Sequence, residues 1–325
     1  MAPSDTEVSV VVPSHERPLR LRWLLNALEE QTLPRERWEL VVVHDSRDDE
    51  TEKLLDEHPL AAAGVLRHRR LEPGTGTPAR QRNVGWRMAT APLVAFTDDD
   101  CRPEPGWLEA LLSEARRSPG AIVQGAVRPD PYESDVLRAA HVRTLEVHPP
   151  GPFGQTANIL YPRAVLEQAD GFDESLPTAA GEDTDLALRA RDQGADYVGA
   201  PDAVVNHAVE AFGLIAYLRL SWKWRHLPLV AKRHPQIREL YPLGLFWRRS
   251  HIWLGLGAAG LALSPRTARA AALALPYARD LLGRRGKHAR GRLRAATEAP
   301  GNVAVDAVEV AALAWGSVRH RTLFL

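Results

Sequence analysis

The sequence predicts an α/β fold in which a mostly parallel sheet carries helices on both faces, with a mainly helical region after it. Two observations predict this fold. In the first part of the chain, short apolar runs such as 8–12 and 39–43 alternate with helical patterns, and that alternation is typical of a doubly wound parallel sheet. After residue 210, helical patterns predominate. We therefore expect two domains, residues 1–210 and residues 211–325.

Each expected strand is a short apolar run that ends at turn residues, and most of the expected helices follow such a turn. The run 8–12 carries no charge and is stopped by Pro13, which favours a strand buried on both faces. Pro18 suits the first turn of a helix, and the leucines at 21, 24, 25 and 28 follow helical spacing. The same reasoning gives strands at 39–43, 64–68, 93–96 and 121–127, and helices from Asp48 or Asp49 to Glu57, at 79–88 and from 105 to 117.

Composition limits the kind of protein. The 325 residues are 45% apolar and 25% charged, a balance typical of folded globular chains. Cys101 is the single cysteine, which excludes an intramolecular disulfide framework and a paired-cysteine zinc site. Residues 1–7 carry no basic segment, and no uncharged apolar run reaches 18 residues. We therefore expect neither a secretory signal nor a conventional membrane span, and we expect a cytoplasmic location.

Charge is distributed unevenly between the two parts. Residues 1–210 hold 36 acidic and 22 basic residues, whereas residues 211–325 hold 5 acidic and 19 basic ones. The acidic first part argues against nucleic acid as a partner. The basic second part indicates either an anionic partner, such as phospholipid headgroups, or a solvated surface rich in arginine.

The last part also combines apolar runs with tryptophan. Residues 211–232 form an amphipathic helical pattern, and the apolar runs 252–263 and 270–278 are too short to span a membrane. Short apolar segments flanked by tryptophan and basic residues are typical of membrane interfaces. We expect this region to bind the inner face of the cell membrane or a lipid-linked acceptor, or else to form a homodimer. The tryptophans concerned are Trp222, Trp224, Trp247 and Trp253.

Polar clusters follow three of the expected strands, after Val12, Val43 and Phe96. The carboxyl ends of parallel strands meet at one edge of the sheet, where ligands bind. The cluster after Phe96 is Asp98-Asp99-Asp100, and alternate carboxylates in a tight turn can face one cation, for which magnesium or manganese is suited. A solvated turn is the alternative. Asp183-x-Asp185 is a weaker pair, because side chains two apart on a helix diverge.

Two further positions are candidates for chemistry. Glu182 and Asp183 begin a helical pattern, where acids are favoured as caps and the helix dipole keeps a carboxylate ionised, as a general base requires. His207 follows the apolar run 203–205. It either completes a metal site as a third ligand or is a polar strand end.

Binding of a nucleotide is the chemistry that the other polar positions favour. Asp45 directly follows the second strand and can accept hydrogen bonds from a base or ribose, and Arg82 can meet phosphates or a base. The glycine-rich loop 74–76 lacks the Lys-Ser/Thr pair of a Walker loop, and no GxGxxG follows the first strand. An NTPase or a nicotinamide-dependent dehydrogenase is therefore disfavoured.

Taken in order, these segments resemble family 2 glycosyltransferases of the GT-A fold, in their bacterial form. The resemblance spans about 185 residues and does not extend beyond about residue 210. The matching stretches are 8–17 (VSVVVPSHER), 39–45 (ELVVVHD), 82–85 (RNVG), 94–100 (VAFTDDD), 170–174 (DGFDE) and 181–183 (GED).

The resemblance implies an inverting, hexosyltransferase-type enzyme of the kind found in polysaccharide biosynthesis. Such an enzyme moves a sugar from a nucleotide-diphosphate donor, with a UDP-sugar expected first, to a hydroxyl of a glycan, a lipid-linked acceptor or a small molecule. It also implies Mg²⁺ or Mn²⁺ held by Asp100 with Asp98 nearby, Asp183 as general base and Glu182 beside the acceptor. The implied nucleotide-sugar site consists of Pro13, His15, Arg17, Asp45, Arg82, Asp98 and Asp99.

The chain departs from the family pattern at His44, at Ser46-Arg47 and at Asp170, which leaves the donor base open. Two other functions stay as alternatives. A sugar-nucleotide pyrophosphorylase needs a glycine-rich triphosphate loop after the first strand, and residues 13–17 carry no glycine. A non-catalytic sugar-nucleotide-binding protein would not need the acidic residues at 98, 100 and 183.

Overall fold

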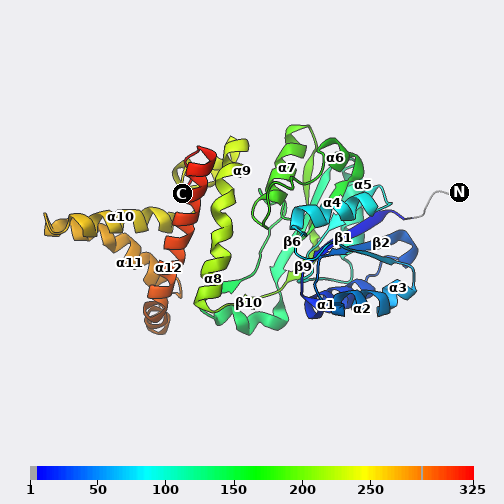
Figure 1. Ribbon diagram of the computed structural model, residues 1–325, viewed down its shortest axis with the longest axis horizontal. Helices are drawn as coiled ribbons and strands as arrows, with labels where there is room; N and C mark the ends of the chain where they lie inside the picture. The colour runs from blue at the N-terminus through cyan, green and yellow to red at the C-terminus, as the bar shows by residue number, and fades with distance from the viewer. Residues whose placement is uncertain (1–5, 287) are drawn as a thin grey trace. The chain divides into compact units, whose positions relative to one another are not determined.

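The computed structural model describes residues 6–286 and 288–325. Its contacts divide the chain into two compact units, Met1–Ala211 and Phe212–Leu325. We call them the sheet unit and the helical unit and describe each by itself. Figure 1 labels their helices and strands.

The sheet unit is built on one eight-stranded sheet with the order β3-β2-β1-β4-β8-β6-β9-β5. Four neighbouring pairs are parallel (β3–β2, β2–β1, β1–β4 and β6–β9) and three are antiparallel (β4–β8, β8–β6 and β9–β5). The mostly parallel sheet predicted from the sequence is thus confirmed. The strands are β1 Val8–Ser14, β2 Trp38–His44, β3 Leu66–Arg70, β4 Leu93–Phe96, β5 Cys101–Pro103, β6 Ile122–Pro129, β8 Ile159–Pro162 and β9 Tyr197–His207.

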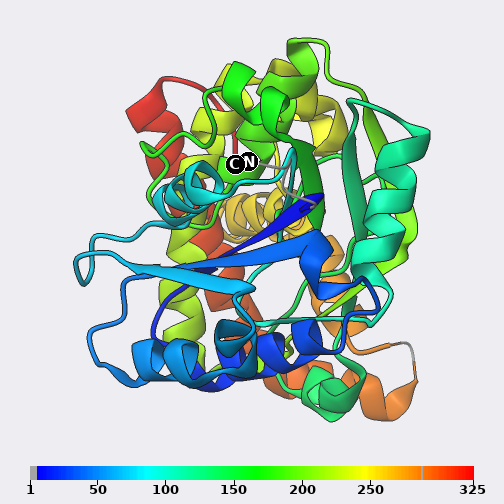
Figure 2. The ribbon, with the colours of Figure 1, turned by 90° about the vertical axis from the view of Figure 1, so that its right-hand side faces the viewer.

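Helices cover both faces of this sheet, because successive strand residues point to opposite sides. Val10 and Val42 pack with one group of helices, whereas Val11 and Val43 pack with the other. In Figure 2 the blue helices α1 to α3 lie on one side of the blue strands and the cyan helix α4 lies on the other. The first face carries α1 Pro18–Glu29, α2 Glu50–Glu57, α3 Pro59–Ala62 and α5 Trp107–Arg117; the second carries α4 Pro78–Met88, α6 Arg163–Gln168 and α7 Glu182–Asp192.

The antiparallel part of the sheet was not predicted. β9 is 11 residues long and carries Pro201-Asp202 in its middle, where a bulge lies opposite Gly125/Ala126 of β6. Its last residue, His207, pairs with Cys101 of β5. Remaining elements of this unit are the strands β7 Val142–Arg143 and β10 Glu210–Ala211, which pair as a separate two-stranded sheet, and the 3₁₀ helices η1 Arg35–Arg37 and η2 Pro131–Arg138.

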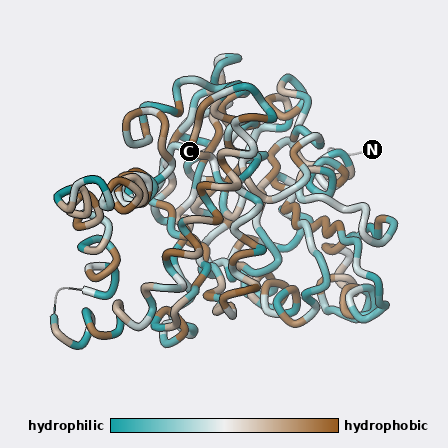
Figure 3. The backbone as a smooth tube through the Cα atoms, turned by 60° about the vertical axis from the view of Figure 1, so that its left-hand side comes forward, coloured by the Kyte–Doolittle hydropathy of each residue, from teal (hydrophilic) through white to brown (hydrophobic). Residues whose placement is uncertain are grey.

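The helical unit is organised around a long helix, α12 Ala289–His320, which packs against α8, α9, α10 and α11. The helix expected at 211–232 is divided by a 3₁₀ segment, and Pro276 lies in the first turn of α11 instead of ending a helix. Hydrophobic and hydrophilic positions alternate along the tube in Figure 3. The other elements are α8 Leu214–Ser221, η3 Trp222–His226, α9 Leu227–Arg233, η4 Pro235–Leu240, η5 Pro242–Gly244, α10 Arg249–Leu263, η6 Ala268–Ala274 and α11 Leu275–Gly283.

Internal contacts occupy part of the basic and aromatic surface that the sequence assigned to a membrane. Arg284 contacts Asp280 and Asp306, with the latter fully buried. The rings of Trp224 and Trp247 pack 4.4 Å apart. Within residues 6–286 and 288–325, none of the helices is both long and apolar enough to cross a membrane.

Candidate active site

Polar side chains from β1, β2, β4, β9, α4 and α7 gather where the first three of these strands end. Most of these residues directly follow a buried apolar strand or lie in the first turns of a helix. The strand or helix therefore sets the position of each Cα atom. The side chains form two networks, one around Asp100 and one around Arg82.

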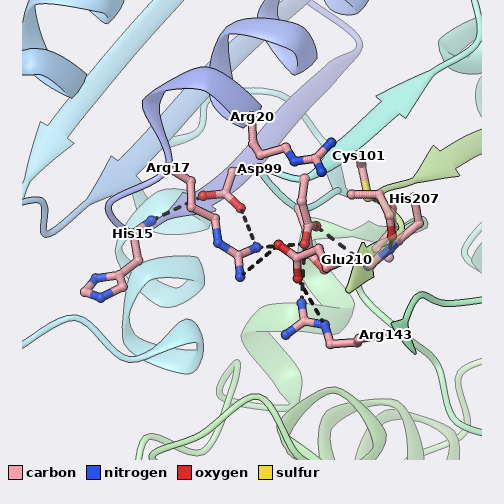
Figure 4. A network of polar contacts seen from close by, with 12 residues as sticks. His15, Arg17, Arg20, Asp99, Cys101, Arg143, His207 and Glu210 are labelled. Carbon is pink, nitrogen blue, oxygen red and sulfur yellow. Dashed lines mark hydrogen bonds and ion pairs between the residues drawn. The ribbon is translucent and has the colours of Figure 1, made fainter. Parts of the chain in front are cut away.

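Asp100 is the centre of the first network, which Figure 4 shows from close by. Its side chain is 3% exposed, and its Oδ2 lies 2.8 Å from Nη1 of Arg17 and 3.3 Å from Nη2 of Arg143. Glu210 lies between the same two arginines, at 3.6 Å and 3.7 Å. Burial disfavours the ionised form of Asp100, but His207, Arg143 and Arg17 together hold its pKa below the ordinary value.

The other oxygen of Asp100 faces His207. The Nε2 atom of His207 lies 3.6 Å from Oδ1 of Asp100, and its Nδ1 lies 2.8 Å from the carbonyl oxygen of Ala208. In the neutral form of the ring, the proton on Nδ1 is donated to that carbonyl and the lone pair is on Nε2, which is the usual arrangement of a metal-binding histidine. Asp100, His207 and the Cys101 thiol form a buried group whose ligand atoms lie within 4.8 Å of one another.

Two of the three ligand atoms in this group, the carboxylate oxygen and the imidazole nitrogen, suit a divalent cation such as Mn²⁺. A carboxylate and an imidazole both bind Mn²⁺, and Mg²⁺ takes the carboxylate. Burial raises the pKa of the Cys101 thiol well above its ordinary value, so a neutral thiol stands beside the pair, and a thiol is no ligand for magnesium.

Asp99 points away from this group. The hydroxyl of Ser14 donates to its Oδ2 at 2.9 Å, and the backbone N–H of His15 donates to the same oxygen at 3.2 Å. Burial, and then the neighbouring charge of Asp100, raise the pKa of Asp99 to about 7. Asp99 therefore joins the end of β1 to the carboxylate triplet.

Arg82 is the centre of the second network. Its Nη2 donates to Asp98 at 2.7 Å and its Nη1 donates to Glu182 at 2.9 Å, and its side chain is 4% exposed. Burial works against its charge, but Asp98 and Glu182 outweigh burial and raise its pKa. The guanidinium also lies over the ring of Phe172, 5.6 Å from its centre. Arg82 on α4 thus links Asp98, which follows β4, to Glu182 in the first turn of α7.

Asp183 follows Glu182 in the first turn of α7 and is partly exposed. Burial and the adjacent Glu182 raise its pKa to about 7, against the opposing effect of Arg82. A carboxylate that exchanges its proton near neutral pH is suited to act as a general base. Asp185 contacts Arg189, with 2.8 Å between carboxylate and guanidinium, so Asp183 and Asp185 have different surroundings.

Asp45 lies at the end of β2 and its side chain is 1% exposed. It receives hydrogen bonds from three directions: from His15 at 2.6 Å, from Gln81 at 3.1 Å and from the backbone of Gly76 at 3.0 Å. A Cβ atom on Gly76 would lie 2.7 Å from the Asp45 carboxyl carbon, so this close approach requires glycine. The His15 side chain is 60% exposed, so the buried Asp45 carboxylate is bonded to a ring that solvent can reach.

The three carboxylates of the triplet have different partners in this structure. Asp98 contacts Arg82, and Asp100 is the member that lies against His207. That Asp98 and Asp100 share one cation stays a prediction. Pro13 is buried within β1. Sequence reasoning missed five residues of the site: Ser14, Gly76, Gln81, Arg143 and Glu210. Ser14 and Gly76 lay inside stretches already singled out, whereas nothing in the pattern marked Arg143 or Glu210.

Comparison with known proteins adds a family match. The model described as Glycosyl transferase family 2 matches residues 9–168. Glycosyltransferase AglE of Haloferax volcanii is 25% identical over 215 residues, which cover 63% of this chain and 68% of the relative. The pre-mycofactocin glycosyltransferase of Mycobacterium tuberculosis is 28% identical over 218 residues, covering 63% of this chain and 43% of the relative. The chain thus spans less than half of that second protein.

A solved structure extends the likeness to the fold of nearly the whole chain. The mannosyltransferase PcManGT from Pyrobaculum calidifontis, solved with GDP-Man and Mn²⁺, superimposes with a TM-score of 0.55. The match covers 99% of this chain and 89% of that one at 22% sequence identity. At this level of identity the likeness shows the fold, which is of the GT-A type.

Proposed function

This chain belongs to glycosyl transferase family 2 through residues 9–168, and from that premise we propose that it transfers a sugar from a nucleotide-diphosphate sugar to an acceptor hydroxyl with inversion at the anomeric carbon. A UDP-hexose is the donor we propose first. The observation that carries the proposal is that Asp100 lies against His207, while Arg82 links the neighbouring Asp98 to the start of α7. There burial and Glu182 raise the pKa of a separate carboxylate, Asp183, to about 7.

We propose that Asp100 and His207 hold Mg²⁺ or Mn²⁺. The tautomer of His207 supports this role, because its Nδ1 is committed to the Ala208 carbonyl and its Nε2 faces Asp100. A divalent cation bound there supplies Lewis-acid stabilisation of the charge that develops on the diphosphate leaving group. Arg17 and Arg143 lie 2.8 Å and 3.3 Å from Asp100, and we propose that they add positive charge near the diphosphate of the donor.

In the proposed reaction Asp183 accepts the proton of the acceptor hydroxyl. The oxygen then attacks the anomeric carbon as the bond to the diphosphate breaks, and direct displacement inverts the configuration. Glu182 lies beside the acceptor in this scheme, held by Arg82 at 2.9 Å. A positioned base of this kind contributes on the order of 10²–10⁴ in rate.

We propose that the donor nucleotide occupies the wall formed by the ends of β1 and β2. Asp45 and His15 form a hydrogen-bonded pair there that can meet the base or the ribose. Asp98, which contacts Arg82, and Asp99, which contacts Ser14, belong to the same proposed site. The full set that we assign to the nucleotide-sugar site is Pro13, His15, Arg17, Asp45, Arg82, Asp98 and Asp99.

A donor panel tests the proposal directly. Purified full-length protein is incubated with UDP- and GDP-sugars and a set of hydroxyl acceptors, and release of nucleoside diphosphate is measured with and without a chelator. Turnover that disappears with the chelator and returns with Mg²⁺ or Mn²⁺ is expected. Undiminished turnover in excess chelator would show that the reaction does not need a divalent cation. Synthesis of a sugar nucleotide from NTP and sugar 1-phosphate would establish the pyrophosphorylase instead.

The variant Asp183→Asn tests the base. Asparagine keeps the shape of the side chain but accepts no proton, so kcat should fall by about 10²–10⁴ while donor binding is retained. Asp192→Asn is the matched control, since Asp192 is an exposed acid on the same helix. Activity of Asp183→Asn within threefold of the control would mean that another residue takes the proton.

For the helical unit we propose contact with an anionic membrane surface or a lipid-linked acceptor. Support comes from its excess of basic residues and from exposed side chains such as Trp222 and Leu275, at 38% and 66%. Flotation of the protein with anionic liposomes at low salt, weakened at high salt, is the expected result. Absence of flotation together with a stable dimer in solution would favour a homodimer.

A further inference from the structure

A second cluster of metal-ligand side chains lies outside the crevice, between the edge of the sheet and α2. His44 ends β2, His68 lies in the neighbouring edge strand β3, and Glu52 lies on α2. One ligand atom from each lies within 4.8 Å of the others. None of these three residues has a role in the proposed transferase reaction.

The pleat of the sheet explains why these side chains meet. Leu40 and Val42 of β2 point to the face that α2 covers, and His44 follows two residues later on the same face. Register pairs His68 with Val42, so His68 points to that face as well. At positions where the pattern calls for apolar residues, the chain therefore places two imidazoles side by side.

Both imidazoles have ring nitrogens that nothing in the described chain satisfies. His44 is 0% exposed, and neither its Nδ1 nor its Nε2 has a hydrogen-bond partner. The Nδ1 of His68 is likewise buried without a partner. Buried polar atoms are almost always hydrogen-bonded in folded proteins. Three unsatisfied ring nitrogens in one cluster therefore indicate that a bound ligand satisfies them.

A fourth residue prepares His68 for a cation. Asp56 lies one turn after Glu52 on α2, and its carboxylate is 2.8 Å from Nε2 of His68. A proton on Nε2 is held by that carboxylate, which leaves the lone pair on the buried Nδ1. Carboxylate, histidine and metal in this order form the arrangement that commonly surrounds protein-bound zinc.

Ring geometry agrees with a shared ion. The centres of the two rings lie 6.1 Å apart at 38°. Two imidazoles on one tetrahedral zinc, each with a Zn–N bond of about 2.1 Å, place their ring centres roughly 5 Å apart, so a shift of about 1 Å brings them to one cation. Glu52 is already positioned by Arg70, whose Nη1 lies 2.9 Å away.

We propose that His44, His68 and Glu52 bind one Zn²⁺ ion, with Asp56 as the hydrogen-bond partner that orients His68. Two imidazoles and one carboxylate select a borderline transition metal over magnesium, for which all-oxygen sets are preferred. The ion would join β2, β3 and α2. Because Asp45 directly follows His44, it would also fix the strand end from which the nucleotide wall begins. The site is independent of the proposed transferase activity.

Cobalt spectroscopy on the full-length chain tests this site. The background is His207→Asn in excess Mg²⁺, so that the crevice does not supply an imidazole. Titration with Co²⁺ should give the visible absorption of a tetrahedral site at one equivalent, and Zn²⁺ should displace it. Adding His68→Asn should lower Co²⁺ affinity at least 100-fold, and adding Asp56→Asn should lower it about 10–100-fold.

Two controls keep the result interpretable. His148→Asn removes an exposed histidine of the same unit, at 91% exposure, and should leave Co²⁺ binding unchanged. Thermal unfolding in chelator should be the same for His68→Asn and its parent, while Zn²⁺ should raise the midpoint of the parent alone. Absence of cobalt absorption in the His207→Asn background, or the same affinity after His68→Asn, would overturn the proposal.

Discussion

Removal of the Arg82 cation is the perturbation whose cost the structure specifies most closely. Arg82 lies between Asp98 and Glu182 at 2.7 Å and 2.9 Å, and its own side chain and that of Glu182 are 4% and 3% exposed. The variant Arg82→Met keeps the length of the side chain and removes its charge. Glu182 is then left as a buried carboxylate without a cation.

Breaking a buried ion pair on one side costs about 3–5 kcal/mol of folding free energy. Asp98 is 26% exposed and regains water, so we expect the lower end, about 3 kcal/mol. The double variant Arg82→Met/Glu182→Gln removes the stranded charge as well. It should therefore be more stable than Arg82→Met alone by about 1–3 kcal/mol, the penalty for a buried polar group left without a partner.

Urea unfolding followed by circular dichroism measures these differences. Arg80→Met is the control on the same helix, because Arg80 is exposed and contacts only a backbone carbonyl at 3.3 Å, and it should change stability by less than about 0.5 kcal/mol. If Arg82→Met and the double variant unfold at the same urea concentration, the explanation by a stranded carboxylate is refuted.

Three further outcomes are expected. Because the base must be ionised and the pKa of Asp183 is raised to about 7, kcat/KM should fall as the pH drops through that value. A flat profile from about pH 6 to about pH 8 would exclude Asp183 as the base. Asp100→Asn should raise the metal concentration needed for half-maximal activity at least tenfold, which a metal titration measures. Gly76→Ala should raise the KM for the donor roughly tenfold with kcat little changed, because its Cβ would lie 2.7 Å from the Asp45 carboxyl carbon. Gly106→Ala, where a Cβ would meet no atom within 4 Å, is the control for that measurement.

Strands that are buried on both faces could be predicted from the sequence. The runs 8–12 and 39–43 became the centre of β1 and β2, and every residue of β1 is buried. β9 could not be predicted in the same way, since its two exposed residues are Pro201 and Asp202 and its pairing with β6 contains a bulge. A strand of this kind is held by neighbours that lie far away in the sequence.

The same difference applies to the site. Asp100 and Asp183 could be chosen as candidate site residues from their positions in the sequence. Asp100 directly precedes β5, and Asp183 lies in the first turn of α7. The direction of each carboxylate in the triplet depends instead on partners from other segments: Arg82 for Asp98, Ser14 for Asp99 and Arg17 for Asp100. Such partners cannot be predicted from the residues next to each carboxylate in the sequence.

The pairing of β5 with β9 has a consequence for how the protein folds. Cys101 pairs with His207, so the ladder that sets Asp100 beside the histidine joins positions more than 100 residues apart in the sequence. Contacts of such long sequence separation are slow to form, because the loop-closure entropy is lost before the contact is gained. The β1–β2 pair, at a separation of 30 residues, can form earlier. Recovery of the divalent-cation binding that we propose for Asp100 and His207 would therefore report the completion of the sheet unit during refolding, and it should lag behind the recovery of helical structure.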